Sequence, residues 1–506
     1  MDANGALAAV NRIYPRLNSR RPEIDKFESY YQGNQKLTFA TEEWMKKNAA
    51  RYDSFSDNWC APVSNAISER IQHTGLKLRD ATGKDATDPF KGIWESWLRN
   101  EMEMQSSQGF LTSFNARRSY VIVWGDEHGD PVNSWEHPSN VEIDYDPDGL
   151  RRRRAALKTW MDEEYEYATL FTPEEVWKWK RKRVRRTRED EAQSAQLRSG
   201  QEFTGGWEAR PPRDTGDDMW PLRNPLGVVP VVEIPNRPLL RGEPVSEIQQ
   251  VIPMQDAINI LWAYLMYAAD MASMPARVLL GTAPPMRKII DSEGKKIGEQ
   301  PITMEALNEA RFAVFSGTDA KIDSWPAAQL DVFTDVIEIA VGHIAAQTRT
   351  PPHYLVSNKG LSNLAADALK AAEIGLVKKA REFQMFANPA IREIHRLNAL
   401  VKGEVALARE IQLATVLWAN PEMRSEAQVS DALVKKKNIG YPFEYLLELD
   451  GVDPSDHSRI MEMRKAEQQA AMEQAMQGVA DGAGYFGGDS DGEQVPDAAL
   501  DRAAAE

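Results

Sequence analysis

The chain has 506 residues, 42% of them hydrophobic, and its formal net charge at pH 7 is −15. This length suffices for two to four domains with cores of their own. The longest uncharged apolar stretch, Ala257–Ala269, would rise only about 20 Å as a helix and is too short to span a bilayer. The single cysteine, Cys60, excludes an internal disulfide and a cysteine-rich zinc site. The acidic balance argues against a tight, nonspecific DNA binder, because such affinity comes mostly from Lys and Arg.

Catalytic and metal-binding motifs are missing from the sequence. It contains no GxxxxGK[ST] phosphate loop, no GxGxxG or GxSxG turn and no HExxH helix. The seven histidines have none of the spacings that zinc ligands favour. We therefore expect a protein without enzymatic activity, cofactor or metal, although catalytic groups can also converge from distant parts of a chain.

The first 118 residues read as mainly helical. Residues 1–50 form an amphipathic helical stretch, and residues 55–75 predict a loop followed by a helix. A further helical pattern covers residues 89–118, with Trp94 and Trp97 on one face. We expect these two tryptophans to lie in the core.

The periodicity changes after residue 118. Residues 119–172 alternate in the way that predicts strands joined by Gly/Asp turns. The run Trp177–Arg188 mixes basic residues with tryptophan, so it is either a charged, solvated strand or hairpin, which we favour, or a nucleic-acid site. Residues 189–219 read as a loop, and Asn224–Pro238 suits an edge strand or an extended connector.

Two long helices are predicted beyond residue 245. Ser246–Met274 forms one helix, or two joined near Pro253, and its second half is apolar nearly all round, so it needs neighbours on several sides. Residues 275–326 are mixed, with a short helix expected around Met304–Ala310, and Ala327–Thr348 forms the second helix. Its apolar stripe consists of Leu330, Phe333, Val336, Ile337, Val341 and Ile344.

The prolines of Arg349–Gly360 end the second helix. A third helical tract runs from Leu361 to about Lys402. Residues 421–475 hold two or three shorter helices, with a turn at Gly440–Pro442. The tail from residue 478 is rich in Gly, Ala and Asp, a composition typical of disorder.

The order and spacing of these segments resemble the portal family of long-tailed double-stranded DNA phages. The resemblance covers roughly residues 25–475. It is carried by FESYYQGNQKLTFA, NWCAPVSNAISERIQHTGL, ARRSYVIVW, NPLGVVPVVEIPNRP, SEIQQVIPMQDAINILWAYLMYAADMASMPARVLLG, AAQTRTPPHYLVSNKG, LAADALKAAEIGLVKKAREF and WANPEMRSEAQVSDALVKKKNIG. It implies an α+β, mainly helical fold whose copies assemble as a ring, twelve-fold in the virion, around a central channel.

The family's regions can be placed on the chain as expectations. They are an N-terminal arm and wing over 1–245, a first stem helix over 246–274, a clip over 275–326, a second stem helix over 327–348, a tunnel loop over 349–360, a long kinked wing helix and return over 361–420, crown helices over 421–475 and an acidic disordered tail over 476–506.

Three groups of residues follow from this placement. The tunnel loop would bring near DNA the residues Arg349, Thr350, Pro351, Pro352, His353, Tyr354, Leu355, Val356, Ser357, Asn358 and Lys359. The stem helices would pack through Ile258, Leu261, Trp262, Leu265, Met266, Phe333, Val336, Ile337, Val341 and Ile344. Asp331, Asp335 and Glu338 share one helix face and are candidates to line the channel, the alternative being an ordinary solvated face.

The resemblance implies a portal, or head-tail connector, at one capsid vertex of the virion, with assembly in the host cytoplasm. Double-stranded DNA would pass through it during packaging and ejection. Its partners would be copies of itself, the terminase large subunit, a head-tail adaptor, and the major capsid and scaffolding proteins, with no membrane. Two alternatives stay open: a DNA-processing or motor enzyme that uses Trp177–Arg188 as its DNA site, and a capsid-associated scaffold that binds protein only.

Overall fold

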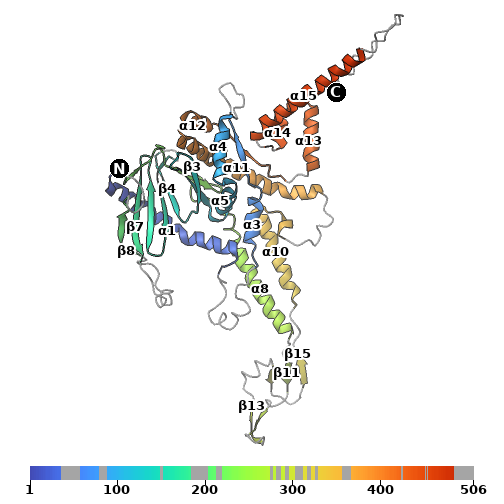
Figure 1. Ribbon diagram of the computed structural model, residues 1–506. Coiled ribbons are helices and arrows are strands. Elements are labelled where there is room, and N and C mark those ends of the chain that lie inside the picture. Colours follow the sequence, from blue (N-terminus) through green and yellow to red (C-terminus); the bar gives the residue numbers. More distant parts are fainter. Residues whose placement is uncertain are drawn as a thin grey trace, which may run out of the picture. The chain divides into compact units, whose positions relative to one another are not determined.

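The computed structural model describes residues 1–35, 57–78, 88–148, 152–183, 203–211, 219–273, 277–280, 286–290, 296–301, 312–315, 321–324, 329–355, 366–422, 426–450, 452 and 454–483 (Figure 1). The chain divides into two compact units, Met1–Met423 and Arg424–Glu506. Helices and sheets both contribute to the first unit, so the expected α+β class is confirmed. No helix in these ranges has the length and apolarity to cross a membrane.

Helix α1 spans Ala3–Gln32 and begins at Asp2, whose side chain accepts a hydrogen bond from the Gly5 amide. Such a cap satisfies a backbone N–H that has no partner within the helix. Its buried side packs on strands β4 (Val141–Tyr145) and β5 (Arg153–Met161). The helical prediction for residues 1–50 is confirmed over this span, and residues 36–56 lie outside the described part of the chain.

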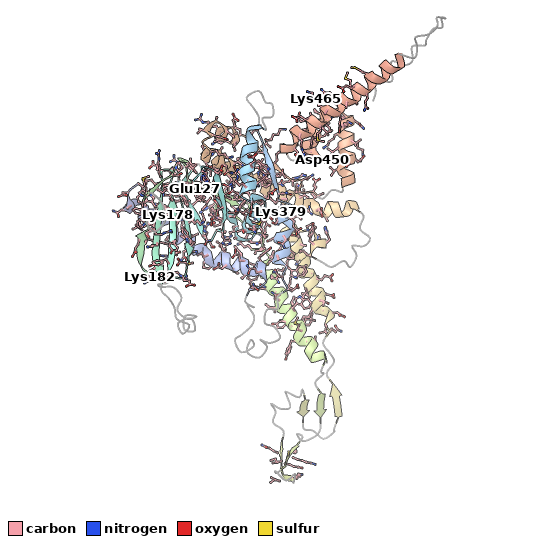
Figure 2. The ribbon with its side chains drawn as sticks, viewed as in Figure 1. Glu127, Lys178, Lys182, Lys379, Asp450 and Lys465 are labelled. Carbon is pink, nitrogen blue, oxygen red and sulfur yellow. The ribbon has the colours of Figure 1, made fainter. Side chains whose placement is uncertain are left out.

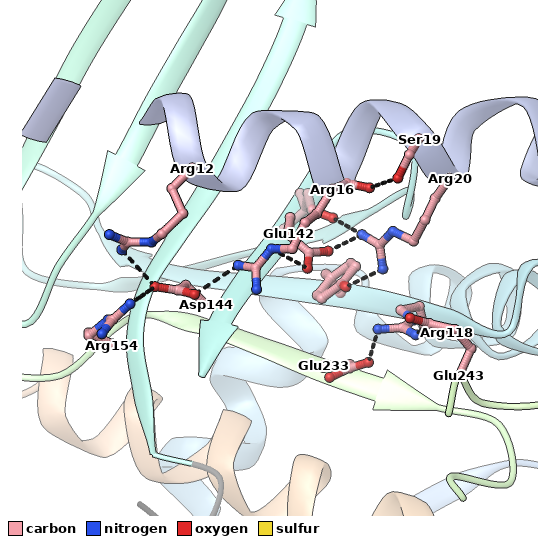
Figure 3. Close-up of polar contacts among 12 residues, drawn as sticks. Arg12, Arg16, Ser19, Arg20, Arg118, Glu142, Asp144, Arg154, Glu233 and Glu243 are labelled. Atoms are coloured by element: carbon pink, nitrogen blue, oxygen red, sulfur yellow. Dashed lines mark hydrogen bonds and ion pairs between the residues drawn. The ribbon is translucent and has the colours of Figure 1, made fainter. Parts of the chain in front are cut away.

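A cluster of arginines around one buried carboxylate ties α1 to the sheet (Figure 3). Arg12 and Arg16 each donate to Asp144 of β4 at 2.8 Å, and Arg154 donates at 2.7 Å. Burial raises the pKa of Asp144, but the hydrogen bonds from these three guanidinium groups outweigh it and lower the pKa below its usual value. The carboxylate therefore stays ionised where the helix crosses the strand.

The next helical region consists of α3 (Cys60–Ser68), α4 (Asp88–Arg99) and α5 (Met102–Ala116). The single pattern expected over 89–118 is two helices, because Glu101 takes a left-handed conformation between them. Trp94 and Trp97 are buried, as expected. Strand β1 (His73–Lys77) pairs antiparallel with β16 (Thr415–Trp418).

Two antiparallel sheets follow. The first has the order β10-β2-β3, with the bounds Val231–Pro235, Arg118–Gly125 and Pro131–Glu136. The second has the order β4-β5-β6-β7-β8, with the bounds Val141–Tyr145, Arg153–Met161, Tyr165–Phe171, Glu175–Arg183 and Phe203–Ala209, and β9 (Leu222–Arg223) pairs with β7. The strands expected over 119–172 are confirmed, and β10 is an edge strand, one of the two forms expected for its segment.

Strand β8 corrects the loop predicted over 189–219. Its sequence, FTGGWEA, contains two glycines and reads poorly as a strand. It forms because β7 offers a backbone edge to pair with, and because Trp207 is buried against α1. Tertiary contacts therefore outweigh local propensity here.

Helix α8 covers Ile252–Ser273 rather than beginning at Ser246. Pro253 lies in its first turn, where the missing N–H has no helical acceptor in any case, so the proline starts the helix and does not kink it. Helix α10 covers Asp331–Thr348 and packs against α8. Between them lie strands β11 (Arg277–Leu280), β12 (Met286–Ile290), β13 (Lys296–Pro301), β14 (Phe312–Phe315) and β15 (Lys321–Ser324).

These five strands form two small sheets. β11 pairs with β14 and β15, and β12 pairs with β13. The short helix expected near 304–310 lies outside the described residues.

The remainder of the first unit is helical. A 3-10 turn, η1 (Pro352–Tyr354), follows α10, and α11 (Ala366–Val401) continues through Gly375 and Pro389 as one helix. Helix α12 (Val405–Ile411) leads to β16. The largest core cluster lies where α11 meets α3, α4, α5 and the first sheet, with Trp97, Phe110, Phe114 and Phe383 at its centre.

The second unit holds α13 (Glu426–Asn438), α14 (Phe443–Asp450) and α15 (Pro454–Ala483). The turn expected before Pro442 is present, with Gly440 at a φ of 95°. Helix α15 runs to Ala483 and so corrects the start of the disordered tail predicted from residue 476. Residues 484–506 lie outside the described part of the chain.

Candidate functional site

The helix pair α8–α10 and the turn that follows α10 form the candidate site, because most residues predicted from the sequence lie there (Figure 1). The two helices share one apolar cluster with α1 and α3. Of the predicted packing residues, those that are buried are Ile258, Leu265, Ile337, Val341 and Ile344, and those that are half-buried are Leu261, Trp262, Met266 and Phe333.

Val336 does not belong to the stripe that is buried within the single chain. Its side chain is 43% exposed, beside the exposed Val332 and Ile339. On a helix, Val336 points about 100° away from Ile337, and this angle places it outside the contact with α8. Helix α10 therefore carries a second apolar strip, Val332–Val336–Ile339, that nothing within the described chain covers.

The acidic residues Asp331, Asp335 and Glu338 occupy a third face of α10. All three are exposed, and their spacing of four and three residues places them in one row. The helix thus presents a buried side, an acidic side and an exposed apolar side. On α8, Tyr264 and Tyr267 are also exposed.

Hydrogen bonds from preceding segments fix the start of α8. The Tyr30 hydroxyl donates to Asp256 at 2.7 Å, and the Trp262 indole donates to Asp57 at 2.7 Å. Burial and then the bond to Asp256 raise the pKa of Tyr30, so this phenol keeps its proton. Cys60 lies in the same cluster, and its burial raises the pKa of the thiol to about 12, which makes it unreactive.

The turn after α10 is packed against the fold. Arg349 caps the helix in a left-handed conformation, and the Thr350 amide donates to the carbonyl of Ala345 at 3.0 Å. Of the predicted tunnel-loop residues, Thr350, Pro351 and Leu355 are buried, His353 and Tyr354 are half-buried, and Arg349 and Pro352 are exposed. Val356, Ser357, Asn358 and Lys359 lie outside the described residues.

Arg70, which follows α3 in the chain, holds this turn through hydrogen bonds. One of its guanidinium nitrogens donates to the Tyr354 hydroxyl at 2.7 Å, and another donates to the Pro421 carbonyl at 2.7 Å. The same group lies 3.2 Å from the carboxylate of Glu373, which also faces His353 at 3.6 Å. Sequence reasoning missed Arg70, because its partners lie some 300 residues away along the chain and no local pattern marks them.

A buried ion pair holds the end of α10. Lys379 of α11, which Figure 2 labels, donates from its ammonium group to the Thr348 carbonyl at 2.9 Å. It also pairs with Glu247, and both side chains are almost fully buried. Asn236 and Arg237 also bind Glu247, at 2.9 and 3.2 Å.

The charges around Glu247 and Lys379 determine the protonation state of each group. Burial raises the pKa of Glu247, but Lys379 and Arg237 outweigh it and lower the pKa below its usual value. Burial also lowers the pKa of Lys379, although the carboxylate opposes that shift. Both groups are therefore charged, and each compensates the other's loss of water.

No group of His, Cys, Asp and Glu side chains within the described ranges is arranged to hold a metal ion. The base of the site is a well-packed region of the fold. Charged groups anchor its backbone, and the helix faces that project from it are acidic on one side and apolar on another.

Residues 10–475 match the family described as "Phage portal protein, SPP1 Gp6-like". The chain is also 25% identical over 413 residues to the "Portal protein" of Mycobacterium phage L5, an alignment covering 78% of this chain and 73% of that protein. The "Portal protein" of Mycobacterium phage D29 is 26% identical over 412 residues, with the same coverage.

Proposed function

Because the chain belongs to the phage portal protein family, SPP1 Gp6-like, we propose that its copies close into a twelve-membered ring at one capsid vertex, through which double-stranded DNA enters and leaves. The observation that carries this proposal is the three-sided surface of α10, with one face buried against α8, one acidic and one apolar but uncovered.

The uncovered apolar strip supports contact between copies. Val332, Val336 and Ile339 expose 55%, 43% and 59% of their surface, and Tyr264 and Tyr267 expose similar fractions on α8. Exposed apolar side chains at helical spacing favour a partner. A repeated contact between two different surfaces of one chain forms a ring when its rotation closes, and a filament when it does not. We assign this strip and the two tyrosines to the interface between neighbouring stem helices.

The acidic row supports a channel wall. Duplex DNA carries one negative charge per roughly 1.7 Å of its axis, so a wall of Asp331, Asp335 and Glu338 would repel it and keep contacts brief. Each copy adds a net charge of −15 to the ring. A wall rich in lysine would retard the DNA instead.

The packed turn refines the tunnel loop. Since Thr350, Pro351 and Leu355 are buried, we assign residues 349–355 to the fixed root of the loop. The part that reaches the DNA would then come after Leu355 and include Lys359. His353 would act through its contact with Glu373 rather than on phosphate.

We keep the region boundaries as proposals: wing 1–245, stem 246–274 and 327–348, clip 275–326, wing return 361–420 and crown 421–475. The energy for packaging would come from the ATPase of a separate terminase large subunit, so this chain would act without catalysis. A head-tail adaptor, and the capsid and scaffolding proteins, would dock on the ring. We expect it in the virion, after assembly in the host cytoplasm.

Electron microscopy of the purified full-length protein tests the ring. Class averages should show closed rings with a central hole wide enough for a duplex. Ile339→Asp, which places a charge in the proposed interface, should abolish rings while leaving the circular dichroism spectrum unchanged. Leu413→Asp is the matched control, because Leu413 is 89% exposed but lies outside α8 and α10.

Two outcomes would contradict the proposal. A wild-type protein that stays monomeric or dimeric at high concentration, with capsid partners present, excludes the ring. Rings that form equally well with Ile339→Asp exclude this strip as the interface. ATPase or nuclease activity in the purified protein would favour the alternative of a DNA-processing enzyme.

A further inference from the structure

A small cavity lies beside the buried ion pair of Lys379 and Glu247. Its volume is about 30 Å³, which is enough for one particle of the size of a water molecule. The residues that line it come from the segment before α8, the end of α10 and α11; they are Arg237, Ser246, Glu247, Gln250, Gln347, Thr348, Arg349 and Lys379. Gln250, Gln347 and Arg349 are exposed, so the cavity is open to ions from the solvent. Neither the proposed ring nor the proposed channel uses it.

The ionisable side chains around the cavity carry more positive than negative charge. Arg237, Arg349 and Lys379 are cationic, and Glu247 is the one carboxylate among the lining residues. Glu247 pairs with Lys379 and also lies 3.2 Å from Arg237, so it cannot neutralise both. Arg349 has no ion pair within the described chain. Burial is the largest cause that lowers the pKa of Lys379, and the charges of Arg237 and Arg349 lower it further.

Hydrogen-bond donors also outnumber acceptors at this cavity. Lys379 has three N–H groups, and its two partners, the Thr348 carbonyl and Glu247, take two of them. Arg237 Nε is buried and has no hydrogen-bond partner among the described residues. A buried donor that lacks an acceptor destabilises the fold. These two groups therefore favour a ligand that accepts hydrogen bonds.

The backbone of both arginines is held in an unusual conformation. Arg237 and Arg349 have φ angles of 41° and 56°, in the left-handed region. A residue with a β-carbon adopts this region only at a cost in free energy, so the surrounding fold must fix it there. Strained residues of this kind cluster where a protein holds a ligand. The strain at both positions therefore supports a binding role for the cavity.

We propose that this cavity binds a single halide anion, with chloride as the natural ligand. The anion would accept hydrogen bonds from the remaining N–H of Lys379 and from Arg237 Nε, and it would offset the repulsion among the three cations. A phosphate or carboxylate group, with several oxygens around a central atom, is too large for about 30 Å³. Water is the competing occupant; it can accept the same hydrogen bonds, but it carries no charge and leaves the repulsion in place.

Urea unfolding of the full-length protein tests the binding in solution. Sodium chloride is compared with sodium gluconate, whose anion does not fit the cavity, at equal ionic strength. For a dissociation constant of about 10 mM, chloride at about 100 mM should raise the equilibrium constant of folding about tenfold over gluconate. Arg349→Gln should lose most of this gain, because it removes one of the three cations. Lys378→Gln is the matched control, because Lys378 is an exposed lysine of α11 that does not line the cavity.

Bromide locates the site, because it replaces chloride and scatters X-rays anomalously. Crystals of the full-length protein grown with about 100 mM sodium bromide should show an anomalous peak in the cavity, within hydrogen-bonding distance of the Lys379 ammonium. The peak should be absent or much weaker in Arg349→Gln and unchanged in Lys378→Gln.

Three results would overturn the proposal. Electron density in the cavity without an anomalous signal would identify a water molecule. An equal gain from chloride in wild type and Arg349→Gln, or equal bromide peaks in both, would show that the excess of cations does not create the site. A ring can form around empty cavities, and a chain that never forms rings can still bind the anion. This inference and the proposed function therefore fail independently.

Discussion

The body formed by the two larger sheets with α5 and α11 differs from the pair α8–α10 in how its side chains find partners. In the body, large apolar groups such as Trp97 and Phe383 are fully buried, and buried charges such as Lys379 and Glu247 meet each other. On α8 and α10, the side chains where the two helices meet are also buried, but Tyr267 and Ile339 are more than half exposed.

This difference teaches which part of the chain can be stable alone. A body with its apolar groups enclosed and its charges paired needs no neighbour, while exposed apolar rows on two packed helices gain free energy only by burial against another surface. Changes in the body should therefore alter folding of the single chain, and changes on the exposed faces of α8–α10 should alter assembly and transport.

Lys379→Met should have the largest effect on folding. It leaves the Glu247 carboxylate buried with Arg237 as its remaining ion-pair partner, and it removes the donor to the Thr348 carbonyl. Breaking a buried pair in this way costs ~3–5 kcal/mol. Urea unfolding should show this loss, and Lys378→Met, at an exposed neighbouring position, should shift the midpoint little. A small loss for Lys379→Met would mean that the pair does not anchor α10.

Acidification should have the next largest effect, because it lowers the free energy of unfolding of the body. His73 and His395 are buried beside Trp94 and Trp97, with their Nε2 atoms 3.0 Å apart. Burial lowers the pKa of His73 to about 4, although a hydrogen bond to the Leu417 carbonyl opposes this shift. Because the unfolded chain binds a proton near pH 6.5 and the folded chain does not, stability should be full above pH 6.5 and fall as the pH drops toward 4.

The expected loss for His73 is about 2 kcal/mol between pH 7 and pH 5. Unfolding free energies measured across this range for wild type and for His73→Gln check it, since the variant should lose less on acidification. His128→Gln is the control, because that histidine is exposed. Parallel pH profiles for wild type and His73→Gln would exclude this pair as the cause.

Tyr354→Phe should have a smaller effect, confined to the turn that follows α10. It removes the hydroxyl that accepts from Arg70, while Arg70 keeps the Pro421 carbonyl and Glu373. The loss should be about 1 kcal/mol. Hydrogen exchange should show faster opening of residues 350–355, and Tyr445→Phe, in the second unit, should leave their protection unchanged. Unaltered protection in Tyr354→Phe would show that Arg70 does not fix the turn through this bond.

Local periodicity and the family resemblance predicted most of the secondary structure. The alternation over 119–172 and the apolar rows of α8 and α10 produce strong patterns, because one face of each element is buried. Strand β8 was missed because its glycines carry no pattern and its partner strand supplies the order. The sequence predicts that α8 starts at Ser246, earlier than its observed start at Ile252, because Pro253 can either kink a helix or begin one.

The anchors of the site could not be predicted from any local pattern. Arg70, Glu247 and Lys379 are ordinary charged residues in sequence, and their roles follow from partners brought together by the tertiary fold. The split of α10 into a buried and an exposed apolar strip was also hidden, since Val336 and Ile337 are adjacent and both apolar. Which of them packs depends on where α8 lies.

The acidic row of α10 should matter least to folding, and so it sharpens the contrast between the body and the pair α8–α10. Reversing Asp331, Asp335 and Glu338 to Lys should change the unfolding free energy by no more than about 0.5 kcal/mol, because all three are exposed. Rings should form normally. In a packaging assay, DNA should move severalfold more slowly, because a basic wall attracts phosphates, and added salt should restore part of the rate.

The matched control for this reversal is Glu462, Glu467 and Glu473 to Lys on α15, which makes the same change in net charge at other exposed positions. If only the α10 variant slows the DNA, the position of the charges is responsible and the row faces the channel. If both variants slow it equally, total charge is the cause, and Asp331, Asp335 and Glu338 belong to an ordinary solvated face. A salt-sensitive slowing confined to α10 would thus separate a surface that meets DNA from one that meets only water.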